Sequence, residues 1–363
     1  MLCAFSSGAA SAVQSSCNAR ASTVWGYATW ATLLSFSTGC LLLTVLVSAE
    51  VLLSHWRSSP EQPPLACLRW RRRPALALLL PGWLGVGYVC ASNFITPLAG
   101  FSVFLVCAVA GQLGTAAALD HLGFGGSLGL RLSPLRACAL LVAAVGAGLT
   151  VSDGLLQGGA GFASPGAMAA CALGSVAAGC AIVVQVALNR QAAALLPSKI
   201  AATWWSFHSG LLGCCLVYGL QAGLQPAASA TFLERSAQAE PFMYMGGLLG
   251  VYYVGASIFI TPYLGSQAYF VCLVSGMLVT SALIDSLGAL QSPVRAVGPL
   301  RGGGIAMVLL AAAATQLQPA ACCTGSRLQA GSAAATAPLP QPEQTAAAEE
   351  GERGKGAAPE AAV

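Results

Sequence analysis

Apolar runs of roughly twenty residues follow one another along most of this chain, and no other feature limits its fold as strongly. A helix needs about 20 mostly apolar residues to cross ~30 Å of hydrocarbon. Ten such stretches lie between charged or Pro-, Gly- and Ser-rich breaks, at roughly 1–19, 27–53, 75–94, 98–119, 134–151, 166–188, 200–222, 242–260, 264–284 and 299–317. The sequence therefore predicts a multi-pass integral membrane protein.

The composition indicates that the spans are helices. Hydrophobic residues make up 56% of the chain and charged residues 8%, against about 25% charged residues in a soluble domain. In hydrocarbon every backbone polar group must be paired within the protein, which leaves helices or closed barrels. Barrel strands alternate apolar and polar residues, and the segment from Leu135 to Val151 shows no alternation. We expect an all-α polytopic protein of about ten transmembrane helices.

An internal repeat divides the spans into two sets of five. Gln14, Asn18, Ser35, Phe36 and Gly39 recur 171 positions later as Gln185, Asn189, Ser206, Phe207 and Gly210. The ten residues from Tyr88 to Pro97 recur 165 positions later, from Tyr253 to Pro262, with eight identical. Because five is odd, the second copy must enter the membrane from the opposite side. Inverted repeats of this kind recur in secondary transporters.

The repeat predicts the domain organisation. Residues 1–152 form the first five-helix repeat, with a short first helix, 153–165 a linker, and 166–317 the second repeat. Residues 318–363 are rich in Pro, Ala, Gly and Glu, a composition that cannot build a packed core. We expect this segment to be a disordered cytoplasmic tail.

Loop charges agree with two repeats of opposite orientation, since cytoplasmic loops carry excess Lys and Arg. Five arginines and one glutamate follow the second expected helix, between residues 57 and 73, whereas Glu234, Arg235 and Glu240 follow the seventh. Arg190 and Lys199, assigned to a loop between the sixth and seventh helices, also favour cytoplasmic termini. The basic cluster is interpreted as a membrane anchor, so no nucleic-acid partner is expected.

Polar residues inside spans are the candidates for substrate binding, because they are costly in a membrane unless they face the protein interior or a cavity. Gln14 and Asn18, like Gln185 and Asn189, are four residues apart and share one helix face. If the two faces meet, four amides line a central site. The alternative is hydrogen-bonding between helices or helix capping.

Two serines complete the substrate-binding hypothesis. Ser35 and Ser206 lie at equivalent positions of the repeats, each four residues before a glycine, Gly39 or Gly210. This spacing of small residues also suits close helix packing. Both interpretations stay open from the sequence.

Three titratable residues are candidates for proton coupling. Asp120 and Asp285 lie at the ends of the fourth and ninth expected helices, and His208 lies within the seventh. A buried carboxylate can exchange a proton for substrate, and an imidazole titrates near neutral pH. The alternatives are carboxylates that orient the turns at Gly123 and Gly288, and a neutral histidine in the core.

Two prolines occupy equivalent positions. Pro97 and Pro262 are expected in very short connections, between the third and fourth and between the eighth and ninth helices. Proline cannot extend a helix without losing a hydrogen bond. Both are interpreted as turn residues and as candidate hinges.

These motifs together resemble the drug/metabolite transporter superfamily, and within it the YdcZ-like branch of inner membrane exporters. The resemblance covers roughly residues 4–316. Its most specific stretches are Gln185-x-x-x-Asn189, Ser206-Phe207-x-x-Gly210, Gly246-Gly247 through Pro262, and Ile284-Asp285-x-x-Gly288, each with an echo in the first half. The resemblance implies a ten-helix, two-repeat transporter that exchanges small solutes without ATP.

The functional expectation is a secondary transporter for a small molecule, a metabolite or drug, working by alternating access in a lipid bilayer. The alternative is a non-transporting receptor or structural membrane protein. With three histidines and no clustered carboxylates, neither an enzyme nor a metal site is expected, and no cofactor is implied. A homodimer is one candidate assembly, and the host membrane is left open.

Overall fold

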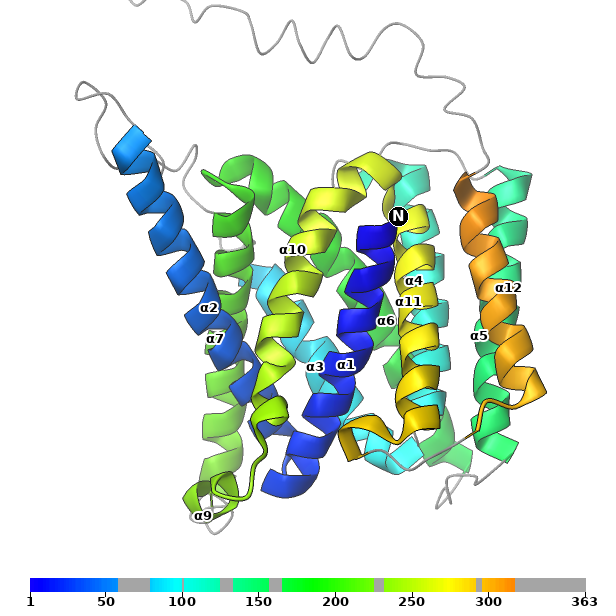
Figure 1. Ribbon diagram of the computed structural model, residues 1–363, viewed down its shortest axis with the longest axis horizontal. Helices are drawn as coiled ribbons and strands as arrows, with labels where there is room; N and C mark the ends of the chain where they lie inside the picture. Colours follow the sequence, from blue (N-terminus) through cyan, green and yellow to red (C-terminus); the bar gives the residue numbers. More distant parts are fainter. Residues whose placement is uncertain are drawn as a thin grey trace, which may run out of the picture. The chain divides into compact units, whose positions relative to one another are not determined.

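Helices account for nearly all of the chain that the computed structural model describes, and no strand occurs there. The described residues are 1–57, 79–99, 101–124, 133–156, 165–224, 232–291 and 296–316. The long helices are α1 (Leu2–Trp25), α2 (Ala28–Arg57), α3 (Leu80–Ala99), α4 (Phe101–Leu122), α5 (Pro134–Leu156), α6 (Pro165–Leu195), α7 (Lys199–Leu224), α10 (Gly246–Leu264), α11 (Ser266–Leu287) and α12 (Pro299–Gln316). Short helical turns are α9 (Phe232–Ser236), η4 (Pro241–Met245) and η5 (Ala289–Gln291). Figure 1 shows the long helices side by side.

Several helices have the length and apolar composition of membrane spans. Among the described residues six candidate spans qualify, at Ala28–Ser54, Phe104–Leu122, Ala169–Leu195, Lys199–Leu224, Pro241–Leu264 and Ser266–Leu287. Pro134–Leu149 and Pro299–Ala314 are shorter apolar helices. Large apolar side chains such as Leu141, Leu220 and Leu310 are about 70% exposed, as expected where lipid rather than water covers the surface. The chain is a multi-pass integral membrane protein.

The first helix is longer than expected. The sequence predicted a short helix over 1–19, whereas α1 has 24 residues and ends at Gly26, whose φ of 78° is left-handed. The polar residues Ser7, Ser11 and Asn18 are buried, so they do not face lipid. The helix can therefore hold hydroxyl and amide groups that lower its apolar character without being interrupted by them.

The helices of the two halves make reciprocal contacts. Within the unit Met1–Leu317, α1 packs on α10 and α11, and α6 packs on α3 and α4. A Cβ atom added at Gly8 would collide with the Leu273 carbonyl, and one added at the equivalent Gly179 would collide with the Ala108 carbonyl. Glycine is required at both positions because the helix backbones touch. Equivalent residues thus make the same contact twice, each time with the opposite half.

A second reciprocal contact joins α2 to α7. The Phe36 and Phe207 rings lie 5.3 Å apart between centroids. Each ring also packs on the glycine of the other helix, Phe207 on Gly39 and Phe36 on Gly210. This contact positions the preceding residues, Ser35 and Ser206, near the middle of the helix bundle.

The two prolines lie inside helices, which corrects the expected placement in connections. Pro97 lies in the last turn of α3, and Pro262 in the last turn of α10. The turn into α11 is made instead by Gly265, with φ of 80°. Helix α10 continues past Pro262 because the Gly265 N–H bonds to the Thr261 carbonyl at 2.9 Å. A hinge role for either proline stays a prediction.

Several expected segments lie outside the described residues. These are most of the basic loop after α2 and the tail at 318–363. Of the linker expected at 153–165, only 157–164 is undescribed, because α5 extends to Leu156 and α6 begins at Pro165.

Candidate functional site

A cavity of about 50 Å³ lies among the helices that make the reciprocal contacts. Since one water needs ~10–15 Å³ of such space, the cavity has room for roughly three to five waters or a small solute. Residues of α1, α2, α3, α4, α6, α7, α10 and α11 line it. Both halves of the chain therefore contribute to one central site.

The structure brings five of the six predicted substrate-facing residues to this cavity. Gln14, Asn18, Ser35, Gln185 and Ser206 line its wall. Asn189 is the exception. Its side chain is 1% exposed, does not line the cavity, and has no hydrogen-bond partner for either amide atom.

The sequence reasoning missed two lining tyrosines. Tyr88 and Tyr253 both face the cavity, together with Gly85 and Gly250 three residues earlier. These glycines and tyrosines belong to the repeated segments of α3 and α10, and residues three apart share a helix face. The repeat therefore indicated these lining residues, although the sequence analysis used it only to predict the topology.

Three polar atoms of lining residues have no partner. They are Gln112 Oε1, Gln185 Oε1 and Ser206 Oγ, on side chains between 1% and 4% exposed. A buried polar atom without a hydrogen bond costs about 1–3 kcal/mol, and such atoms are rare in native proteins. The three atoms are enclosed within the wall of the cavity, so the wall contains polar groups whose hydrogen bonds are not made in this conformation.

Asn18 and Asn189 lie toward opposite ends of the bundle. Asn18 Oδ1 is next to Gly246, the first residue of α10. Arg190, the neighbour of Asn189, is hydrogen-bonded through Nη1 to Ser266 Oγ at 3.5 Å, just after α10 ends. Helix α10 has 19 residues, so these two points are separated by about 28 Å at 1.5 Å per residue.

Asp120 does not line the cavity but caps another helix. Its Oδ1 accepts the Ser266 backbone N–H at 2.9 Å, and its Oδ2 accepts the Gln267 N–H at 2.8 Å. Both N–H groups belong to the first turn of α11, where they have no partner within the helix. The negative charge also suits the positive end of the helix dipole.

Arg190 completes a polar network with this cap. The sequence placed Arg190 in a loop, but it lies inside α6 and is only 7% exposed. Its bond to Ser266 joins α6 to the helix that Asp120 caps. Charged residues from α4 and α6 thus meet the start of α11 at the Asn189 end of the bundle.

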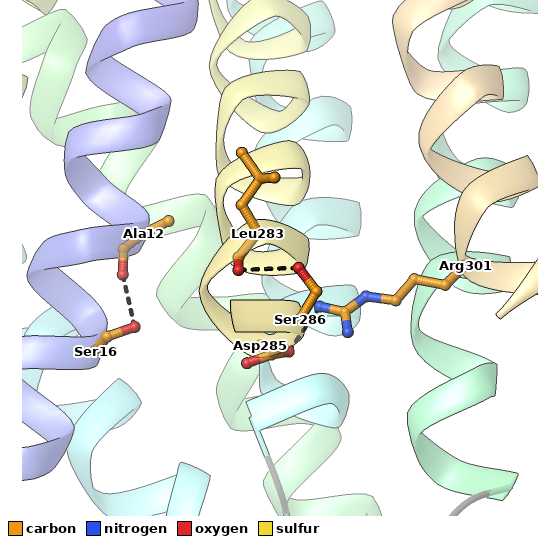
Figure 2. A network of polar contacts seen from close by, with 6 residues as sticks. All are labelled: Ala12, Ser16, Leu283, Asp285, Ser286 and Arg301. Carbon is orange, nitrogen blue, oxygen red and sulfur yellow. Dashed lines mark hydrogen bonds and ion pairs between the residues drawn. The ribbon is translucent and has the colours of Figure 1, made fainter. Parts of the chain in front are cut away.

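The other two proton-coupling candidates also lie away from the cavity. Asp285 accepts a hydrogen bond from Arg301 Nη2 at 2.7 Å, so that it joins α11 to α12 (Figure 2). His208 Nδ1 donates to the Trp204 carbonyl at 2.8 Å, and its ring stacks on Trp204 at 4.0 Å. The structure brings none of the three into contact with the lining amides.

Comparisons with known proteins agree with this architecture. A family model described as "Putative inner membrane exporter, YdcZ" matches residues 1–149 and 170–314. A solved structure described only as "Crystal structure of protein" covers 86% of this chain and 98% of its own, with a TM-score of 0.57 and 16% identity. At that identity the likeness concerns the fold alone. No curated protein matches the chain.

Proposed function

Because the chain belongs to the YdcZ family of inner membrane exporters, we propose that it is a secondary transporter that moves a small solute by alternating access. The central cavity is its substrate site. All ten long helices cross the membrane, as two five-helix repeats of opposite orientation, at 1–152 and 166–317. The reciprocal contacts of α1 with α11 and of α6 with α4 support this arrangement.

One observation carries the proposal: equivalent residues of the two repeats do not contribute equally to the cavity lining. All four of Asn18, Ser92, Asn189 and Ser257 are buried, but Asn18 and Ser92 line the cavity and the equivalent Asn189 and Ser257 do not. The cavity therefore extends toward the Asn18 end and is closed at the Asn189 end. Two halves with related sequences but an unequal share of the cavity lining are what one state of an alternating-access cycle requires.

The opposite state follows from the repeat. Exchanging the conformations of the two halves brings Asn189 to the cavity and removes Asn18 from the cavity lining. The Asp120 cap on α11 lies at the end that must then open. The missing hydrogen bonds of Asn189 support this exchange, because a buried amide without a partner gains free energy when it reaches water or substrate.

The alternative, a non-transporting receptor or structural protein, predicts different hydrogen-bond partners for the amides. In a helix scaffold they would be consumed by direct contacts between helices. Gln112 and Gln185 instead keep side-chain oxygens without a partner beside a cavity. This observation favours transport.

Flux in reconstituted liposomes tests the proposal. Purified protein is incorporated into vesicles, and uptake of labelled neutral, cationic and anionic small solutes is compared with empty vesicles. We expect saturable uptake of at least one solute, lowered by Gln185→Leu in the cavity wall. Gln221→Leu is the matched control, since Gln221 lies near the end of α7 and contacts Thr29. Uptake equal to that of empty vesicles for every solute contradicts the proposal.

A further inference from the structure

We infer that Asp120 and Asp285 exchange partners between the two states of the protein. Each carboxylate caps the first turn of the facing helix when its own end of the bundle is closed, and pairs with an arginine of its own half when that end is open. This inference rests on the proposed function, because it takes the two halves to exchange conformations. Its basis is the different interactions that two equivalent residues make in one structure.

The closed end of the bundle holds the cap. Both oxygens of Asp120 accept backbone N–H groups, from Ser266 at 2.9 Å and Gln267 at 2.8 Å. The side-chain Nε2 of Gln267 also donates to the Arg136 carbonyl at 3.2 Å. Arg136 therefore lies beside the capped turn, although its guanidinium makes no ion pair with Asp120.

The other end of the bundle holds the ion pair. Asp285 lies there, because α10 begins beside Asn18 and α11 runs back from the turn at Gly265. Its carboxylate accepts a hydrogen bond from Arg301 Nη2 at 2.7 Å, within the second half of the chain (Figure 2). The Asp285 side chain is 28% exposed, which agrees with an open end.

The repeat supplies the same parts to both halves. The offset of 165 positions relates Asp120 to Asp285, Arg136 to Arg301, and the first two residues of α4, Phe101 and Ser102, to Ser266 and Gln267. Each half thus has a carboxylate, an arginine 16 positions later and a helix start. The structure shows the cap made by one carboxylate and the ion pair made by the other.

The register of α4 and α11 permits a cap at either end. The two helices pack on each other and have 22 residues each. Asp120 is the twentieth residue of α4 and bonds to the first two residues of α11, so the helices are antiparallel. Asp285 is likewise the twentieth residue of α11. Because both helices rise equally per residue, Asp285 lies level with the start of α4, and only the separation of the helices decides whether it caps α4.

The exchange leaves neither carboxylate without a partner. The N–H groups of a helix's first turn have no partner within the helix, and a carboxylate there also meets the positive end of the helix dipole. An unpaired buried carboxylate would be costly. Since one cap and one ion pair exist in each state, the two states can lie close in free energy, as a cycle between them requires.

The two caps differ in strength. Arg190 Nη1 bonds to Ser266 Oγ at 3.5 Å beside the Asp120 cap. The counterpart of Arg190, 171 positions earlier, is Ala19, and the counterpart of Ser266 is Phe101. Neither side chain can make that bond. The state with the Asp120 cap is therefore expected to be the resting state.

Distances between spin labels at the two ends test the exchange. Nitroxide labels are placed on the full chain in lipid nanodiscs, in a background without the native cysteines, at one of two equivalent pairs. Leu122 and Tyr263 report on the closed end, and Leu98 and Leu287 on the open end; all four side chains are more than half exposed. Pulsed electron paramagnetic resonance gives the distances and the population of each state.

Asp120→Asn is expected to lengthen the first distance and shorten the second. The population ratio of the two states should shift by roughly 10- to 100-fold, because the variant weakens hydrogen bonds to a charged group only in the resting state. Glu50→Gln is the control, a carboxylate on α2 that accepts a bond from Ser198, and should leave both distances unchanged. Unchanged distances in Asp120→Asn contradict the inference.

The double variant with Asp285→Asn separates an exchange of partners from simple loosening of one end. Without Asp285 the start of α4 has no carboxylate to cap it. We therefore expect the shortening between Leu98 and Leu287 to be lost in the double variant. A shortened distance that persists there overturns the exchange.

Should Asp120→Asn fail to fold, the two arginines decide. Arg301→Gln breaks the ion pair of the resting state and should favour the opposite state by roughly 2- to 5-fold. The equivalent variant Arg136→Gln should shift the populations the other way, because it removes the ion pair expected in the opposite state. The same shift in both variants, or none in either, contradicts the exchange.

These distances are separable from transport. Distances that shift as expected, without flux of any solute in liposomes, support the exchange of partners and contradict the transporter. Flux with distances that do not depend on Asp285 supports the transporter and contradicts the exchange.

Discussion

The carboxylate of Asp120, at the end of α4, accepts the backbone N–H of Ser266 at the start of α11, so a helix of one half anchors a helix of the other. The second carboxylate oxygen accepts the next N–H, from Gln267. Asp120 is only 1% exposed. The equivalent residue Asp285 makes a different interaction, an ion pair with Arg301. The side chain of Asp285 is 28% exposed. Equivalent carboxylates therefore stabilise the two ends of the bundle differently.

Replacing Asp120 by Asn should destabilise the protein by about 1–3 kcal/mol, because an amide offers one acceptor oxygen where the cap uses two charged ones. The matched variant Asp285→Asn should cost only about 0–1 kcal/mol, as for other partly exposed ion pairs. Thermal unfolding of both variants in the same detergent gives the comparison. Equal losses would contradict a structural cap at Asp120.

Replacing His208 by Gln should leave transport and its dependence on pH unchanged. His208 bonds to the Trp204 carbonyl and stacks on that residue's ring, and it does not line the cavity. Solute uptake in liposomes at several pH values, with and without a pH gradient, measures the effect. A loss of gradient-driven uptake in His208→Gln would instead indicate that His208 is a proton-coupling group.

A cysteine placed at Asn18 should react with a small thiol reagent faster than one placed at Asn189, in a background without the native cysteines. Both side chains are buried, at 3% exposed for Asn18 and 1% for Asn189, but only Asn18 lines the cavity. Labelling rates followed by mass spectrometry test this difference. Added substrate that drives the opposite state should reverse the order, and equal rates for both positions would argue against the one-sided cavity.

Alanine at Gly8 and at Gly179 should destabilise the protein to a similar extent, by roughly 1–3 kcal/mol each, because overpacking forces the helices apart. Each new Cβ meets a backbone carbonyl of the opposite half, at Leu273 or Ala108. Gly219→Ala is the control, since nothing lies within 4 Å of its Cβ position. Thermal unfolding is the measurement, and tolerance of alanine at either position would refute the reciprocal contact there.

The helices themselves could be predicted from local pattern. The run predicted at 264–284 became α11, Ser266–Leu287, because an apolar stretch between Gly265 and Gly288 has clear ends. The family was likewise recognisable from the repeated motifs. The first helix was predicted to stop at residue 19, before the charged residue Arg20, whereas α1 continues to Trp25 because Ala21 and Trp25 are buried in the folded molecule.

Part of the candidate site could likewise be predicted from local pattern. Gln14 and Asn18 share a face through helical spacing alone, and both line the cavity. Tyr88 and Gln112 required knowing which helices meet. So did the Asp120 cap, because Ser266 is 146 positions away along the chain.

Helical periodicity and the apolar runs are local properties, so the amino-acid order alone established a helical membrane protein, its repeat and its family. The same Gln-x-x-x-Asn pattern occurs twice, yet Asn18 faces a cavity and Asn189 is sealed from it. No local pattern can separate them, because the difference depends on how distant segments of the chain pack around each residue. At the Asn189 end α4, α6 and α11 meet through Asp120 and Arg190, a relationship between distant segments that exists only in the folded molecule.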